Sequence, residues 1–173
     1  MSEHETRSDV VAGKTPREST VDMTQIALPY DANPRGFVLG GHIMHQIDLV
    51  AAMCAVKHAR RECVTASMDD LYFHHPIRIG DFVTYSARLN YVGRTSMEIE
   101  VRVRAETPLT GDTTTTTTAY VTFVALDAYG KPTPVPPLVL ETADDHRRWS
   151  RAEARRAERT RRLETRRVED REA

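Results

Sequence analysis

The chain has 173 residues, with 24 Lys or Arg against 25 Asp or Glu, so its formal net charge is −1. This balance gives no overall field that would draw the protein to nucleic acid or to an anionic membrane surface. The length suits one domain with a sizeable core and polar tails. Two cysteines without metal-ligand spacing, and no apolar run of roughly 18 residues, predict a cytoplasmic protein that does not enter a membrane.

The first half of the sequence is dominated by one apolar helix. Residues 1–20 are charged or small and polar and predict a disordered tail, 21–28 predict a first strand, and 30–36 read as a loop. A helix is then expected from the glycine pair at 40 and 41 to about Arg61. Its apolar residues surround the axis instead of forming one stripe, which indicates burial on all sides. Asp48 is the lone carboxylate between residues 41 and 56, so it needs compensating donors or a function.

Strand patterns fill the second half. We expect strands at residues 64–73, 83–91, 97–104 and 113–126, the last including the threonine run 113–118. In the second and third of these, apolar and polar residues alternate, which predicts antiparallel pairing with one face toward solvent. Tyr91 falls on the apolar face by this count, and Glu98 and Glu100 on the solvated one.

These elements predict an α+β domain in which a sheet curls about a long helix. Such a sheet leaves part of the helix uncovered, so a second subunit is expected to cover it. Residues 141–173 predict an Arg-rich helical tail, with eleven Arg and six acidic residues from 146 onward. Interspersed acids and pairs such as Glu158/Arg162 favour a solvated or oligomer-packing helix over a nucleic-acid surface.

Several motifs in register resemble those of the hotdog-fold acyl-CoA thioesterases. They cover about residues 20–140 and are Asn33-Pro-Arg-Gly36, Gly40-Gly-His-Ile-Met44, Asp48, Val64-Thr-Ala, Phe73, Pro76-Ile77, Gly80-Asp81, Val92-Gly-Arg-Thr-Ser-Met97, Ala105-Glu106, Thr122-Phe-Val-Ala125 and Pro136 to Leu138. The resemblance implies a hotdog domain at 21–140 that binds acyl-CoA and CoA without metal or cofactor. It also implies a homodimer joined sheet edge to sheet edge, often assembled as a trimer of dimers.

The resemblance also implies roles for particular residues. Asn33 and Asp48 match the catalytic pair, which acts across the dimer interface. The turn Gly93-Arg94-Thr95-Ser96 matches a segment that borders CoA. From helix physics, the N–H groups of Gly41 and His42 are candidate oxyanion donors, because the first turn of a helix leaves them unpaired. Asp48 would then act as general base or as nucleophile, while Asn33 orients the water or the carbonyl.

Each of these interpretations has a structural alternative. Asp48 could be an acid paired with a basic partner, Asn33 an ordinary turn residue, and Arg94 a residue that fills a turn. His42, His45 and Asp48 are spaced three apart and could form a metal-binding face. Cys54 and His58 are spaced like a nucleophile pair, although a small core cysteine is the simpler interpretation.

The sequence therefore predicts an enzyme that hydrolyses acyl-CoA to a carboxylic acid and CoA. The main alternative is a non-catalytic acyl-CoA sensor on the same fold. A hydratase or dehydratase acting on acyl thioesters is a third hypothesis, and His42 and His45 could serve it.

Overall fold

A computed structural model of the chain describes residues 12–69 and 71–172, with side chains as far as residue 165. Its elements in order are α1 (Pro16–Ser19), β1 (Val21–Ile26), η1 (Pro29–Asp31), α2 (Gly40–Ala59), β2 (Glu62–Met68), β3 (Phe82–Val92), β4 (Ser96–Glu106), β5 (Thr113–Leu126) and α3 (Ala143–Glu172). The strands form one antiparallel sheet in the order β1-β3-β4-β5-β2. None of the helices in the described ranges is long and apolar enough to cross a bilayer.

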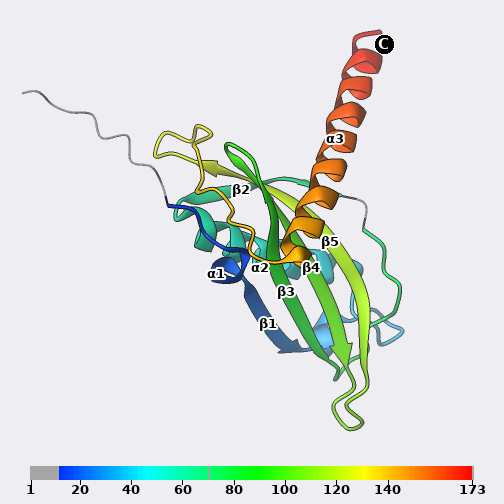
Figure 1. Ribbon diagram of the computed structural model, residues 1–173. Coiled ribbons are helices and arrows are strands. Elements are labelled where there is room, and N and C mark those ends of the chain that lie inside the picture. The colour runs from blue at the N-terminus through cyan, green and yellow to red at the C-terminus, as the bar shows by residue number, and fades with distance from the viewer. Residues whose placement is uncertain (1–11, 70, 173) are drawn as a thin grey trace, which may run out of the picture.

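The sheet curves around α2, as Figure 1 shows. One side of α2, including Ile43, Ile47 and Val50, packs into a core with the inward-facing residues of β3, β4 and β5. The opposite side remains uncovered: Met44, Leu49, Met53 and Val56 are each 40–44% exposed. The expected α+β architecture is confirmed, and so is the partly uncovered helix.

The N-terminal segment differs from its prediction. Residues 12–20, expected to be disordered, include α1, where Pro16 occupies the first turn and Glu18 accepts from the backbone of Thr15. Ser19 is fully buried, and Lys14 donates to the backbone carbonyl of His58 at the end of α2. The short helix is ordered because these contacts fix it against the domain. Residues 1–11 lie outside the described residues.

Three strand predictions are corrected by the structure. The strand expected at 64–73 ends at Met68, and residues 71–73 lie beside β5 without regular strand pairing, held by the bond from the Thr117 hydroxyl to the Tyr72 carbonyl. The register of β3 against β4 shifts between Leu89 and Tyr91, so Tyr91 faces away from the core. Such a bulge inserts one residue and reverses the alternation beyond it. Glu98 and Glu100, expected in water, are 2% and 8% exposed.

The two glutamates are buried because α3 covers the outer face of the sheet (Figure 1). Arg155 and Arg159 donate to the two carboxylate oxygens of Glu98, and Arg148 donates to Glu100 at 2.8 Å. Burial opposes ionisation of Glu100, but hydrogen bonds from Arg148 and Asn90 outweigh it, so the pKa of this carboxyl is lowered.

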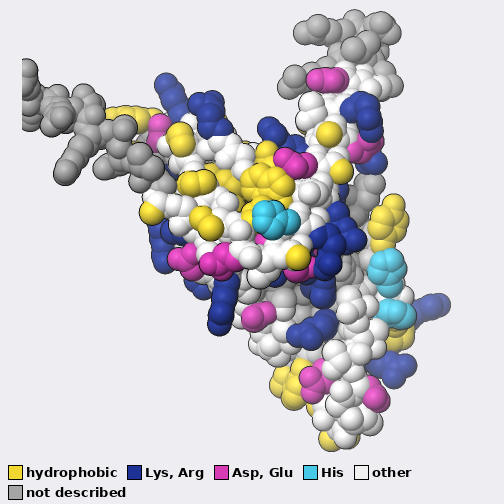
Figure 2. Space-filling model, in the orientation of Figure 1, with side chains coloured by type: hydrophobic (Ala, Val, Ile, Leu, Met, Phe, Trp, Pro, Cys, Tyr) yellow, Lys and Arg dark blue, Asp and Glu magenta, His cyan; other side chains and the backbone are white. Residues whose placement is uncertain are grey.

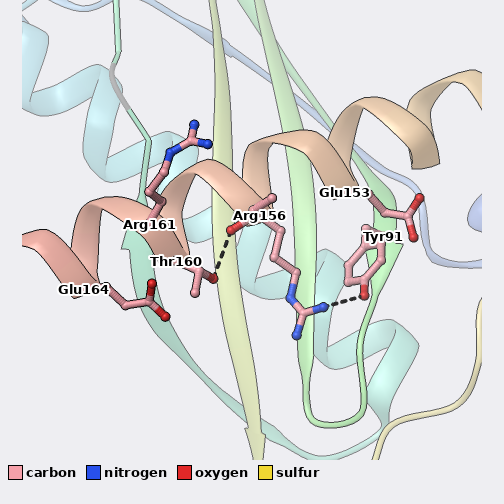
Figure 3. A pocket seen from close by; sticks show the side chains of 7 residues that line it. Tyr91, Glu153, Arg156, Thr160, Arg161 and Glu164 are labelled. Carbon is pink, nitrogen blue, oxygen red and sulfur yellow. Dashed lines mark hydrogen bonds between the residues drawn. The ribbon is translucent and has the colours of Figure 1, made fainter.

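Aromatic contacts hold α3 to the end of β3. The Tyr91 ring lies 4.4 Å from that of Trp149, centroid to centroid. Arg156 reaches from α3 to the Tyr91 hydroxyl at 2.9 Å, beside a cavity of about 590 Å³ (Figure 3). Farther along α3, basic and acidic side chains are interspersed on the surface (Figure 2). The helix therefore packs on its own sheet through its first half and carries a mixed-charge surface beyond it.

Candidate active site

Asn33 lies in the loop between η1 and α2, and its amide has a fixed orientation. Its Oδ1 accepts the backbone N–H groups of Arg35 at 2.9 Å and Phe37 at 3.3 Å. Gly36 closes this loop in the left-handed region at φ 78°, which glycine adopts without strain. Because the carbonyl oxygen of the side chain is occupied, the half-buried Asn33 offers its Nδ2 donors to a ligand.

The start of α2 presents unpaired backbone donors. Leu39 is the N-cap and gives no side-chain cap, and the first helical bond runs from Ile43 N–H to the Leu39 carbonyl. The N–H groups of Gly41 and His42 therefore lack helical acceptors. A Cβ on Gly41 would meet no atom within 4 Å, whereas one on Gly40 would touch the Phe73 ring at 3.3 Å. The backbone is thus open on the side of Gly41, where a ligand can approach.

Asp48 lies seven residues beyond Gly41, nearly two turns farther along α2, and is half-buried in the single chain. Its Oδ1 accepts the hydroxyl of Thr65 on β2 at 2.6 Å. Among the described residues no Lys, Arg or His forms an ion pair with Asp48. The alternative that Asp48 is paired with a basic residue is therefore not supported within the described chain. The carboxylate is oriented by a neutral donor and keeps Oδ2 available.

The turn at residues 93–96 connects β3 to β4. Gly93 N–H donates to the Ser96 carbonyl at 2.8 Å, and the carbonyls of Arg94 and Thr95 accept from Val135 and Ala125. The Arg94 side chain is exposed and forms no ion pair in the described chain. These bonds use only the backbone of Arg94, which leaves its guanidinium free for an anionic ligand.

The predicted residues form two groups within one chain. Thr65 pairs with Phe123, which pairs with Met97, so Asp48, Thr65 and the turn at 93–96 share one end of the sheet. Asn33, Gly41 and His42 gather at the start of α2. No hydrogen bond joins Asn33 to Asp48 in the described chain. Thr65 belongs to the matching Val64-Thr-Ala motif but was given no role from the sequence, because a polar residue in a strand shows no chemical function until the fold places it beside Asp48.

Two alternative sites are not supported by the structure. No group of three or more His, Cys, Asp or Glu side chains among the described residues could hold a metal ion. Cys54 is fully buried, and burial raises the pKa of its thiol to about 12. The His58 ring is held by Ser19 and the Pro136 carbonyl, at 3.0 and 2.9 Å. Cys54 is therefore a core residue and not a nucleophile.

The cavities along α3 are separate from these residues. Three of them, with volumes of about 280–590 Å³, are lined by α3 and the outer face of the sheet, and neither Asn33 nor Asp48 borders any of the three. Asp48 instead lies beside the edge strand β2, where it contacts Thr65, and the Asn33 group lies at the start of α2, where His42 contacts Gln25 on β1.

Comparison with known proteins identifies the family. A model of the thioesterase superfamily matches residues 35–111. YkhA of Bacillus subtilis, an uncharacterized acyl-CoA thioester hydrolase, is 43% identical over 129 residues, which are 75% of this chain and 75% of that protein. The chain belongs to the thioesterase superfamily. The hotdog fold and the family resemblance expected from the sequence are confirmed.

Solved thioesterase structures match most of the chain. The acyl-CoA hydrolase of Bacillus cereus gives a TM-score of 0.85 at 39% identity, covering 90% of this chain and 96% of that one. A hexameric acyl-CoA thioesterase gives 0.85 at 37%, covering 88% and 98%. The Staphylococcus aureus acyl-CoA hydrolase, solved with butyryl-CoA, CoA and CoA disulfide, gives 0.83 at 35%, covering 90% and 95%. That enzyme was also solved with alanine replacing an asparagine, an aspartate or a threonine.

Proposed function

We propose that this protein is an acyl-CoA thioesterase that hydrolyses acyl-CoA to a carboxylic acid and CoA. The observation that carries the proposal is the environment of Asp48, a carboxylate on an apolar helix that is oriented by the Thr65 hydroxyl and faces the uncovered side of the fold. An acid in that setting, with a neutral partner, is available to react with water or with a thioester carbonyl.

The substituted positions of the S. aureus enzyme support this assignment. Its asparagine and aspartate are 15 residues apart, and its aspartate and threonine 17. Asn33, Asp48 and Thr65 have the same two spacings in this chain. That match supports including Thr65 in the proposed site beside the two residues expected from the sequence.

The chemistry follows from the donors and acceptors of the two groups. Asp48 either takes a proton from water as the water attacks the carbonyl carbon, or attacks that carbon itself to give an anhydride that water then opens. In both routes the C–S bond breaks and the thiolate of CoA leaves. The developing oxyanion accepts hydrogen bonds from Nδ2 of Asn33 and from the backbone N–H groups of Gly41 and His42. One such donor is worth about 3 kcal/mol in other enzymes.

The complete site is proposed to need two copies of the chain. Asp48 is eight residues beyond the start of α2, about 12 Å along its axis, while Asn33 lies before that start. β2 is an edge strand that pairs only with β5 in the described chain. Antiparallel pairing of two β2 edges would place two α2 helices side by side in opposite directions. The start of one helix would then approach the Asp48 region of the other, and the apolar side of each would be covered.

The same assembly gives CoA its binding surface. The turn Gly93-Arg94-Thr95-Ser96 lies at the sheet end that carries Asp48 and Thr65. The exposed Arg94 guanidinium would meet the phosphates of CoA. The hexameric relative supports a trimer of such dimers as the full assembly.

Thiol release from acyl-CoAs of graded length tests the function. We expect turnover by the wild type and a loss of at least about a hundredfold in Asp48→Asn, the scale of removing a general base. Thr65→Val should lower kcat by a smaller factor, because Asp48 remains but loses its orienting donor. Asp22→Asn, an exposed acid on β1, is the matched control. A wild type that binds acyl-CoA and releases no thiol would refute the enzyme and favour a sensor.

A further inference from the structure

A buried aspartate joins the two segments that carry the proposed oxyanion donors. Asp31 ends η1, two residues before Asn33, and is 5% exposed. Its Oδ2 accepts the Leu28 N–H at 3.0 Å, and its backbone carbonyl accepts the N–H of Leu39, the N-cap of α2, at 2.8 Å. Its Oδ1 lies 3.3 Å from Nδ1 of His42, in the first turn of α2. Asp31 thus contacts both ends of the loop that holds Asn33.

The histidine in this arrangement has both ring nitrogens engaged. His42 Nε2 lies 3.3 Å from the amide nitrogen of Gln25 on β1. An amide nitrogen only donates, so Nε2 accepts, and the proton of a neutral ring is on Nδ1, facing the Asp31 carboxylate. An Asp–His pair could in principle serve as a base, as in the hydratase hypothesis. Here neither ring nitrogen is free to take a proton from a substrate. The role left for the His42 side chain is to link Asp31 to the first turn of α2.

We propose that Asp31, acting through His42, is a positioning residue that fixes the Asn33 loop relative to the start of α2. This inference rests on the proposed thioesterase function. A single carbonyl oxygen can receive the Asn33 amide and the first-turn N–H groups together only if the two segments keep a constant separation. Misplacement of reacting groups by about 1 Å costs on the order of a hundredfold in rate.

Asp31→Asn tests the contact selectively. The asparagine keeps an oxygen for the Leu28 N–H, but its NH2 group would face the Nδ1–H of His42, donor against donor. Asp81→Asn is a closely matched control: Asp81 is also buried and accepts the N–H of the residue three before it, Arg78, at 2.9 Å. It makes no contact with His42.

We expect Asp31→Asn to lower kcat by about ten- to a hundredfold, within the range for misplaced reacting groups, with KM changed less than about twofold. Asp81→Asn should leave both constants near those of the wild type. His42→Gln should lower kcat by a similar factor, and the double variant Asp31→Asn/His42→Gln no further, because both changes break one link. Additive losses, a change confined to KM, or wild-type kcat in Asp31→Asn would each overturn the proposal.

Two measurements keep the test decisive. If Asp31→Asn fails to fold, His42→Gln decides, because that side chain is 24% exposed and tolerates replacement. Hydrogen exchange over residues 28–42 gives a readout independent of activity, and it should accelerate in Asp31→Asn but not in Asp81→Asn. A wild type without thioesterase activity refutes the proposed function. Unchanged exchange in Asp31→Asn refutes the positioning role even in that case.

Discussion

Replacing Glu98 by Gln tests whether α3 is held by the buried charge beneath it. One Glu98 oxygen receives Arg155 at 3.2 and 2.6 Å, and the other receives Arg159 twice at 3.1 Å. Removing one partner of a buried ion pair costs about 3–5 kcal/mol. The two arginine side chains are 24% and 20% exposed, and Arg159 keeps Asp69 as a second partner. We therefore expect the lower end of this range, about 3 kcal/mol.

Urea unfolding followed by two signals measures this loss. Trp149 is the single tryptophan of the chain and packs against Tyr91, so its fluorescence reports the docking of α3, while far-UV circular dichroism reports the whole fold. In thermal unfolding, the same loss of about 3 kcal/mol should lower the melting temperature by about 6–12 °C, at roughly 2–4 °C per kcal/mol for a domain of this size.

The control is Glu106→Gln, the same change at the exposed end of the same strand. It should alter the free energy of unfolding by less than about 0.5 kcal/mol. If Glu98→Gln unfolds at the same urea concentration as this control, the two arginines do not hold α3 through Glu98, and the explanation for its burial is wrong.

Three further predictions concern pH, thiol reactivity and backbone strain. Burial lowers the pKa of His58, so the unfolded chain binds a proton that the folded chain excludes. The free energy of unfolding should therefore fall as the pH drops from about 6.5 toward the folded pKa. His58→Gln should flatten this dependence on pH, whereas the control His74→Gln, at an exposed histidine, should not. Cys54 should react with a thiol reagent at pH 8 only after unfolding, since its pKa is about 12; modification of the native protein at the unfolded rate would contradict its burial. Gly36→Ala should cost about 1 kcal/mol or more in urea unfolding, because φ there is 78°, and no loss would show that the loop relaxes.

Local pattern predicted the elements through different signals. Period-2 alternation indicated β3 and β4, an apolar stretch after a glycine pair indicated the long helix, and the strand propensity of threonine indicated β5, which runs from Thr113 to Leu126 as expected. The pattern failed at Asn90, where the bulge reverses the faces and no glycine marks it. It also failed at Glu98, because alternation says which face a residue occupies and not whether a second layer covers that face.

The covering layer did leave a signal. Arg148, Arg155 and Arg159 are spaced 7 and 4 residues apart, so they share one face of α3, where three cations need acidic partners. Asn33 and Asp48 were named through the family resemblance, whereas the contact of Asp48 with Thr65 joins residues from a helix and a strand. Such a contact depends on the packing of α2 against β2, which the periodicity of neither segment encodes.

The strand order also has a consequence during synthesis. Within the described chain β2 pairs only with β5, and 58 residues separate Met68 at the end of one from Leu126 at the end of the other. At about 5–20 residues per second, a ribosome needs roughly 3–12 s to supply that partner. Throughout this interval the apolar helix α2, which is synthesised just before β2, has no complete sheet to cover it. The nascent polypeptide should therefore bind chaperones until β5 has been synthesised.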